Sequence, residues 1–156
     1  MEADTLTYIQ VQEDDFSLAA EYQALIDGNS RDGAVVTFCG LVRDMNFVNS
    51  VSSLFLEHYP GMTEKSLLSI IELARNKWPL GRIRVVHRVG RLQVSEQIVF
   101  VGVTSQHRQA AFQGAEFIMD FLKTQAPFWK KETTKEGQYW VDAKQSDNHK
   151  AKLWGI

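Results

Sequence analysis

The feature that most constrains the fold is an almost uninterrupted apolar run, IVFVGV, at residues 98–103. A strand with one wet face would alternate apolar and polar side chains, whereas this run contains no polar residue. Burial of such a strand requires further layers of structure on both sides of its sheet. The run therefore predicts a central β-strand in a sheet that is covered on both faces.

Other segments are predicted to be strands because they are rich in β-branched and aromatic residues or alternate with a period of two. They are residues 5–12, 33–44 with a break at Gly40, 54–59, 82–89 and 138–141. In residues 82–89 the side chains of Arg84, Val86 and Arg88 alternate with apolar ones, and we expect them to form the wetter face of the strand. The stretch that follows, residues 90–96, is expected to turn the chain back.

Helical spacing of apolar residues predicts three helices. Asp14 or Asp15 can cap the first, and Thr63 can cap the second, which follows a turn at Pro60 and Gly61. The apolar face of the second helix comprises Leu67, Ile70, Ile71, Ala74 and Trp78. With no internal repeat and no linker, these elements predict one α+β domain over residues 1–156.

The third helix lies within residues 104–132, where the polar chemistry of the chain is concentrated. Thr104 or Ser105 is expected to cap it, and Pro127 ends it because proline lacks an amide donor. A spacing of about 100° per residue predicts one apolar stripe. Its members are Ala111, Phe112, Ala115, Ile118, Met119 and Leu122.

Lys123 falls at the edge of this stripe, and Phe117 and Phe121 imply that the other side of the helix is covered too. We therefore expect its ammonium group to be partly desolvated, which suits proton transfer or nucleophilic chemistry. The alternative is an ordinary surface pair with Asp120, worth only about 0.2–0.5 kcal/mol. The segment 128–132, FWKKE, is expected to fold back and bring its lysines toward Lys123.

His107 and Arg108 lie at the expected helix start, where free amide groups and the helix dipole favour an anion. A solvated first turn explains the pair equally well. The cationic residues together predict an anion pocket formed by Arg43, His107, Arg108, Lys123, Lys130 and Lys131. No serine, cysteine or carboxylate pair is an obvious nucleophile, so the reactive group must come from elsewhere.

Composition excludes several classes of function. The net charge of −2 and pI of about 6.1 argue against a general nucleic-acid or membrane-surface protein. Cys39 is the single cysteine and is expected to be inert, while His58 and His87 are expected to be structural. Neither a metal motif nor a cofactor motif is present, and the acidic start of the chain lacks a signal region, so a cytoplasmic setting is expected.

Five blocks identify a resemblance to the large, catalytic subunit family of molybdopterin synthases. They cover most of residues 32–132, in the order of that family: DGAVVTFCGLVRD, LEHYPGMTEKSL, WPLGRIRVVHRVG, IVFVGVTSQHRQAAF and FIMDFLKTQAPFWKKE. The resemblance implies an α/β hammerhead-type fold with an additional antiparallel β region. It also implies a homodimer within a heterotetramer, in which each copy binds a small ubiquitin-like sulfur-carrier subunit.

By this resemblance the C-terminal Gly-Gly thiocarboxylate of the carrier enters the pocket and supplies the missing nucleophile. The resemblance also implies that the substrate is cyclic pyranopterin monophosphate, which receives two sulfurs and becomes the dithiolene of molybdopterin. Lys123 and Lys130 match the family's catalytic lysines. The resemblance places further pocket residues at Leu41, Val42, Arg43, His107, Arg108, Lys131 and Glu132.

Leu41 departs from the family, which often has lysine after the glycine of this strand. The departure keeps open the alternative of a non-catalytic receptor or scaffold for a ubiquitin-like tail. A further alternative is a regulator that binds a small phosphorylated molecule. Residues 44–53 are expected to form a mobile loop beside Arg43, and residues 145–156 a tail that a partner orders.

Overall fold

A computed structural model of the chain describes residues 6–43, 53–134, 137–141 and 153–154, and for residues 129–134 and 137–141 it describes the backbone. The loop 44–52 and most of the tail predicted from residue 145 onward lie outside the described residues.

The first sheet is built around the apolar run, as its composition predicts. Its order is β1-β4-β6-β2, in which β1 pairs parallel with β4 and the other two pairings are antiparallel. Phe100, Val101 and Val103 in the central strand β6 are fully buried. The strands are β1 (Thr7–Gln12), β2 (Ala34–Leu41), β4 (Leu80–Arg88) and β6 (Gln97–Ser105).

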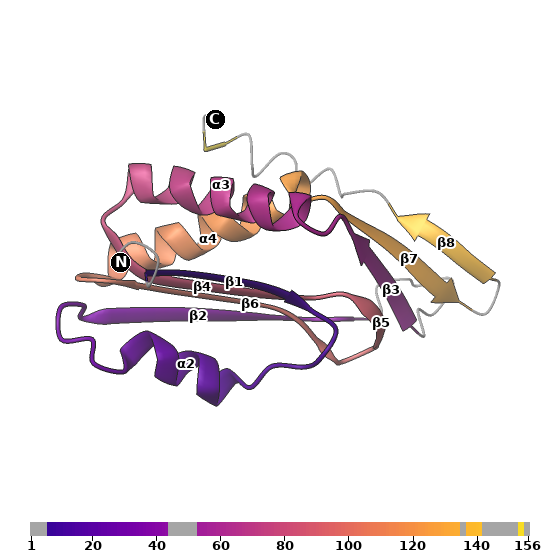
Figure 1. Cartoon of the computed structure of the whole chain (residues 1–156), viewed down its shortest axis with the longest axis horizontal. Helices are drawn as coiled ribbons and strands as arrows, with labels where there is room; N and C mark the ends of the chain where they lie inside the picture. The colour runs from indigo at the N-terminus through magenta and orange to yellow at the C-terminus, as the bar shows by residue number, and fades with distance from the viewer. Residues whose placement is uncertain (1–5, 44–52, 135–136, 142–152, 155–156) are drawn as a thin grey trace.

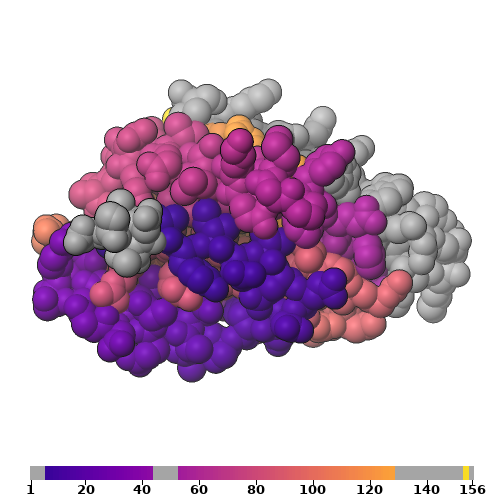
Figure 2. Space-filling model, in the orientation of Figure 1, coloured from indigo at the N-terminus to yellow at the C-terminus, as the bar shows by residue number. Residues whose placement is uncertain are grey.

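Helices cover both faces of this sheet (Figure 1). Helix α2 (Leu18–Ile26) lies on one face, and α3 (Met62–Lys77) and α4 (Arg108–Gln125) lie on the other. In Figure 2 β1 and α2 form the indigo and purple lower part of the visible surface, with α3 in magenta and pink above them. The two-sided burial of β6 therefore follows from a three-layer arrangement.

A second, fully antiparallel sheet adjoins the first, in the order β5-β3-β7-β8. Its strands are β3 (Ser53–His58), β5 (Gly90–Gln93), β7 (Phe128–Thr134) and β8 (Gly137–Val141). The expected α+β class, with a layered sheet and an additional antiparallel β region, is confirmed. Residues 90–96 were expected to form only a turn, and this is wrong because residues 90–93 pair with β3 as a strand.

The wetter face predicted for β4 is also wrong in part. Val86 is 1% exposed and Arg88 is 7% exposed, because this face packs under α2 and the loop before it. Alternation of charged residues along a strand does not reveal that another segment covers their alkyl chains and accepts their hydrogen bonds.

The helix starts differ from the predicted caps. Ser17 caps α2, accepting a hydrogen bond from the Ala20 amide, so neither aspartate does. Gly61, with φ of 86°, precedes α3, and its amide donates to the Glu64 side chain, while Thr63 lies inside the helix. Thr104 and Ser105 are buried in β6, and α4 begins after His107. The helices themselves are correctly predicted.

Helix α4 is covered on more than one side, as Phe117 and Phe121 suggested, and both are buried. One member of its predicted stripe is not, since Phe112 is 62% exposed. The helix ends at Gln125, and the extended backbone of the following Ala126 fits a residue that precedes proline.

We predict that Gly81→Ala destabilises the fold by about 1–3 kcal/mol, because a Cβ there would overpack the interior. It would clash with the Asp32 carboxylate and lie 2.6 Å from the Thr104 hydroxyl oxygen. Denaturant unfolding measures the change, with Ser30→Ala in the nearby loop as a control that should shift stability by less than about 0.5 kcal/mol. Equal stability of Gly81→Ala and wild type would contradict the packing described.

Candidate functional site

The first predicted site residues lie at the C-terminal end of β2, which we call its exit. Leu41 is 56% exposed, Val42 is buried against Leu54 and Leu92, and Arg43 is exposed. Backbone hydrogen bonds hold Val42 on both sides, from its amide to the Glu96 carbonyl (2.9 Å) and from the Ser95 amide to its carbonyl (2.6 Å). Arg43 therefore leaves a fixed point of the backbone and projects from the edge of the core.

Lys123 lies in the final turns of α4 and is exposed. The expectation that its ammonium group is partly desolvated is wrong for the single chain, because the covered sides of α4 are those of Phe117, Phe121 and the buried stripe. The side chains of Lys123 and Arg43 make no hydrogen bond or ion pair with any described residue. Both cations are thus available to a ligand.

Strand β7 carries Lys130, Lys131 and Glu132, which pair in register with Leu56, Phe55 and Leu54 of β3. The expected fold-back of this segment is wrong, since the chain continues past Pro127 as a strand of the second sheet. The start of this strand is fixed to the first sheet, because the Phe128 ring stacks on His87 with centroids 3.9 Å apart.

These elements meet at one end of the molecule. His87 pairs with Val99 near the start of β6, and Gly40 pairs with the same residue from the other side. The stack of Phe128 on His87 brings the end of α4 and the start of β7 to this point (Figure 1). We call it the Lys123 end; it comprises Leu41, Val42, Arg43, Lys123 and the backbone of residues 130–132.

His107 and Arg108 lie at the opposite end, which we call the His107 end. They are exposed and follow Ser105, the last residue of β6. Fifteen residues of helix separate Arg108 from Lys123, which at about 1.5 Å per residue is about 22 Å. The interpretation of all six cations as one pocket is therefore wrong for a single chain, because α4 runs the length of the sheet between them.

Phe38 is a candidate that sequence reasoning missed. It is 41% exposed on β2, and a Cβ at Gly40 would lie 3.4 Å from its ring and 2.7 Å from Val99 of the core under α4. The ring thus lies on the α4 face of the sheet near the Lys123 end, where it offers an aromatic surface to a flat ligand. An apolar run such as VVTFCG gives no sign that its aromatic member is exposed.

Cys39 lies on the other face of the sheet, against the cluster of Phe16, Leu25, Val86 and Phe100 under α2. Burial raises the pKa of its thiol, so little of it is the nucleophilic thiolate. In the described part of the chain there is no group of three or more His, Cys, Asp or Glu side chains suited to a metal. Among these residues there is also no helix long and apolar enough to cross a membrane.

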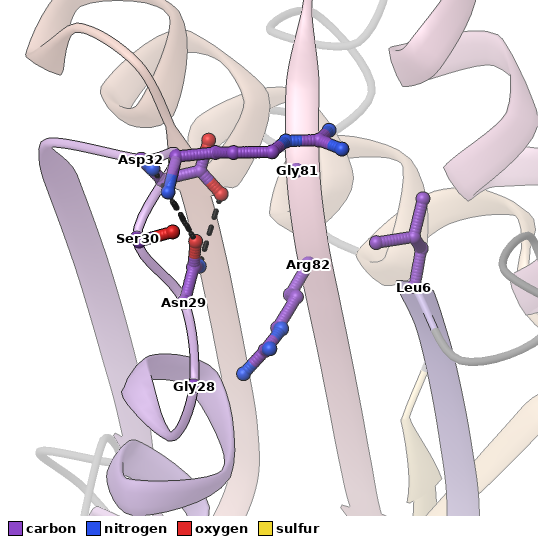
Figure 3. Close-up of a pocket in the computed structure, with 8 residues that line it drawn as sticks. Leu6, Gly28, Asn29, Ser30, Asp32, Gly81 and Arg82 are labelled. Carbon is purple, nitrogen blue, oxygen red and sulfur yellow. Dashed lines mark hydrogen bonds between the residues drawn. The ribbon is translucent and has the colours of Figure 1, made fainter.

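A cavity of about 190 Å³ near the end of α2 contains none of the predicted site residues (Figure 3). Asp32 accepts hydrogen bonds from Asn29 (3.0 Å) and Thr104 (2.8 Å), and Arg82 donates to the Ala24 and Asp27 carbonyls at the end of α2. These polar groups fasten α2 and the following loop to the sheet. Their role is structural.

Trp154 shows that the end of the chain docks on its own helices. Its indole N–H donates to the buried Asp120 carboxylate at 2.7 Å, and its ring meets Trp78 and Phe117 edge-on. For this residue, the expectation that only a partner orders the tail is wrong. Asp120 precedes Lys123 by one helical turn, so the contact braces the part of α4 that carries the lysine.

We predict that Trp154→Phe lowers stability by about 1–3 kcal/mol, because the buried Asp120 loses a donor while most of the apolar contact remains. In a protein of this size the midpoint of thermal unfolding should fall by about 2–12 °C. Leu153→Ala is the matched control, since Leu153 is 72% exposed. An unchanged midpoint for Trp154→Phe would show that the hydrogen bond contributes nothing.

Known proteins resemble this chain along nearly its whole length. The family model described as MoaE protein matches residues 11–125. The molybdopterin synthase catalytic subunit of Vibrio cholerae is 58% identical over 146 residues, which are 94% of this chain and 97% of that protein. The molybdopterin biosynthesis MoaE protein from Burkholderia ambifaria superposes with a TM-score of 0.83 at 49% identity, covering 96% of this chain and 99% of that one.

A more distant structure has the same fold. It is a complex of subunits 1 and 2 of molybdopterin-converting factor from Helicobacter pylori, with a TM-score of 0.69 at 17% identity, covering 88% of this chain and 90% of that one. The family match covers most of the first sheet, strands β3 and β5 of the second sheet, and α4 with its exposed lysine. This chain belongs to the MoaE protein family, the family of molybdopterin synthase catalytic subunits.

Proposed function

We propose that this chain transfers sulfur from the C-terminal thiocarboxylate of a small ubiquitin-like carrier subunit to cyclic pyranopterin monophosphate. Two such transfers form the dithiolene of molybdopterin. The observation that carries this proposal is the composition of the Lys123 end, where Arg43 and Lys123 are exposed and have no partner among the described residues. Such a site binds and polarises anions, and the attacking sulfur arrives on the carrier.

Lys123 is assigned the central catalytic role, with Lys130 of β7 as its helper. Each transfer forms a carbon–sulfur bond on the pterin and breaks a carbon–oxygen bond at the same carbon, whose oxygen leaves as water or with the phosphate. Hydrolysis then breaks the carbon–sulfur bond to the carrier, and water supplies the oxygen that replaces sulfur there. Negative charge develops during both the attack and the release of the carrier. A cation at this position stabilises that charge, which commonly contributes on the order of 10²–10³-fold per donor.

Arg43 is assigned to bind the anionic substrate, with Leu41 and Val42 forming the adjacent wall and Lys131 and Glu132 continuing the site along β7. The flat face of Phe38 suits stacking with the pterin. Because Leu41 lacks a charge, its contribution is limited to its backbone and apolar surface.

His107 and Arg108 cannot join this site from the same chain, since α4 separates them from Lys123 by about 22 Å. We propose that they enter the Lys123 end of a second copy in a homodimer. A two-fold axis that places the His107 end of each copy against the Lys123 end of the other makes two equivalent sites. The free amide groups at the start of α4 and the cationic Arg108 then receive the phosphate of the substrate.

The test is reconstitution of the purified chain with thiocarboxylated carrier and cyclic pyranopterin monophosphate, followed by an assay for molybdopterin. Product formation at a rate that depends on both components supports sulfur transfer. Carrier binding without product would indicate a receptor for the ubiquitin-like tail, and pterin binding without any carrier requirement would indicate a regulator. Either of these two results would overturn the proposed function.

A further inference from the structure

Arg88 is a buried arginine at the end of β4, on the face that the sequence predicts to be the wetter one. Its side chain is 8% exposed. Its guanidinium donates to the Glu13 carbonyl at 3.0 Å and 3.1 Å, which fixes the loop between β1 and α2. It also lies 3.8 Å from the Asp15 carboxylate of that loop.

The other side of the same guanidinium binds the start of β6. It donates to the Glu96 carboxylate at 3.1 Å and to the Gln97 carbonyl at 2.9 Å. These two residues face the exit of β2, because Gln97 pairs with Leu41 and the Glu96 carbonyl accepts from the Val42 amide. Arg88 thus binds Glu96 and Gln97, and these two residues hold Val42 and Leu41, which directly precede Arg43.

The turn between β5 and β6 completes this support. Ser95 adopts a φ of 79°, a left-handed backbone conformation that costs free energy for a residue with a side chain. In this conformation its amide donates to the Val42 carbonyl at 2.6 Å. Contacts with another part of the protein must therefore stabilise this turn. The ion pair between Arg88 and Glu96, the residue after Ser95, is such a contact.

Glu96 is well suited to this task. The hydrogen bond from the Gln93 amide, and after it that from Arg88, lowers the pKa of its carboxyl below the ordinary value. The carboxylate therefore remains charged and bridges the two strands of the turn, with one oxygen on Arg88 and the other 2.7 Å from the Gln93 amide.

We propose that Arg88 is a positioning residue for the sulfur-transfer site, acting through Glu96 and the β5–β6 turn to fix the point from which Arg43 reaches the substrate. This inference rests on the proposed function, in which Arg43 binds the pterin substrate. Arg88 does not touch the substrate itself. Lysine cannot replace it, because one ammonium group lacks the planar fork that binds Glu13, Glu96 and Gln97 at once.

The experiment is a double-mutant cycle with Arg88→Lys and Arg43→Ala, measured in the reconstituted enzyme. Arg88→Lys should raise the KM for cyclic pyranopterin monophosphate on the order of tenfold, as expected when a binding group is displaced. The affinity for the carrier should be unchanged. In the Arg43→Ala background the same change should have almost no further effect on this KM, because the group that it positions is already absent.

Arg84→Lys is the matched control. It makes the same exchange on the same strand, at an arginine that pairs with Glu21 (2.8 Å) and stacks on Tyr8 on the sheet surface away from β2. Its KM should equal that of wild type. If Arg88→Lys does not fold, as judged by thermal unfolding, Glu96→Gln decides the question, since it keeps an acceptor oxygen and should raise the KM several-fold in the same non-additive way.

Suppose that Arg88→Lys, or Glu96→Gln in its place, raises the KM by the same factor in the wild type and in the Arg43→Ala variant. This result would overturn the positioning role and leave a purely structural one. An unchanged KM in these variants would overturn it as well. Failure of the proposed function is distinguishable, because Arg43→Ala alone would then leave the KM for the pterin substrate unchanged.

Discussion

Replacement of Lys123 by alanine is expected to lower the rate of molybdopterin formation by at least about 10²–10³-fold. The lysine is exposed at the Lys123 end, beside the exit of β2 and the start of β7, and has no competing partner among the described residues. In the proposed mechanism, its removal leaves the charge that develops on the reacting sulfur and oxygen without its principal stabilising group. Single-turnover assays with thiocarboxylated carrier measure the loss.

The fold should survive this change, because an exposed side chain on the last turns of a helix contributes little to stability. Thermal unfolding and carrier affinity should therefore match the wild type. Lys65→Ala, at an equally exposed lysine of α3, is the control and should retain full activity. Near-normal turnover of Lys123→Ala would remove Lys123 from the mechanism.

Replacement of Arg108 by alanine is expected to lower kcat/KM about 10–100-fold, mainly by raising the KM for the pterin substrate. A hydrogen bond from a charged group to a phosphate contributes about 1.5–3 kcal/mol, which corresponds to that range. Arg108 is exposed and lies about 22 Å from Lys123 along α4, so within one chain it could not act on the same substrate.

Gln109→Ala is the control for Arg108→Ala, since Gln109 is the exposed neighbour on the same turn of α4. Its kcat/KM should stay close to that of wild type. An unchanged KM in Arg108→Ala would show that the His107 end does not bind substrate.

The layered part of the fold could be predicted because burial leaves a direct pattern in the sequence. A strand without polar residues, such as residues 98–103, has few arrangements other than the centre of a covered sheet. The apolar face of α3 was predicted for the same reason, and Leu67, Ile70, Ile71 and Ala74 are all buried.

The errors arose where tertiary contacts override local pattern. Arg88 is buried because the segment around Glu13 supplies carbonyl acceptors for its guanidinium, and no local sequence rule reports an acceptor 75 residues away. Phe112 matches the apolar stripe of α4 and is nevertheless 62% exposed. It lies one turn beyond Arg108, so a second copy that receives Arg108 would also cover this ring.

The set of candidate site residues stays a prediction, and the structure contradicts only the expectation that they form one pocket within a single chain. Helical spacing identified the cations at the two ends of α4, and only the length of that helix in space shows that they are far apart. The strand pairing of residues 130–132 with β3 was likewise invisible, because the segment FWKKE has no strand pattern of its own and depends on β3 and β8 for its hydrogen bonds.

The most direct test of the central claim, a site shared between two copies, is complementation between the two impaired variants, measured at a substrate concentration below the KM of Arg108→Ala. Lys123→Ala and Arg108→Ala chains with different tags are co-expressed, and the mixed dimer is purified through both tags. In a shared arrangement one of its two sites combines an intact Lys123 from one chain with an intact Arg108 from the other. The mixed dimer should then recover roughly half of the wild-type activity per dimer. Activity no higher than that of the two single variants would contradict the shared site and show that both residues act within one chain.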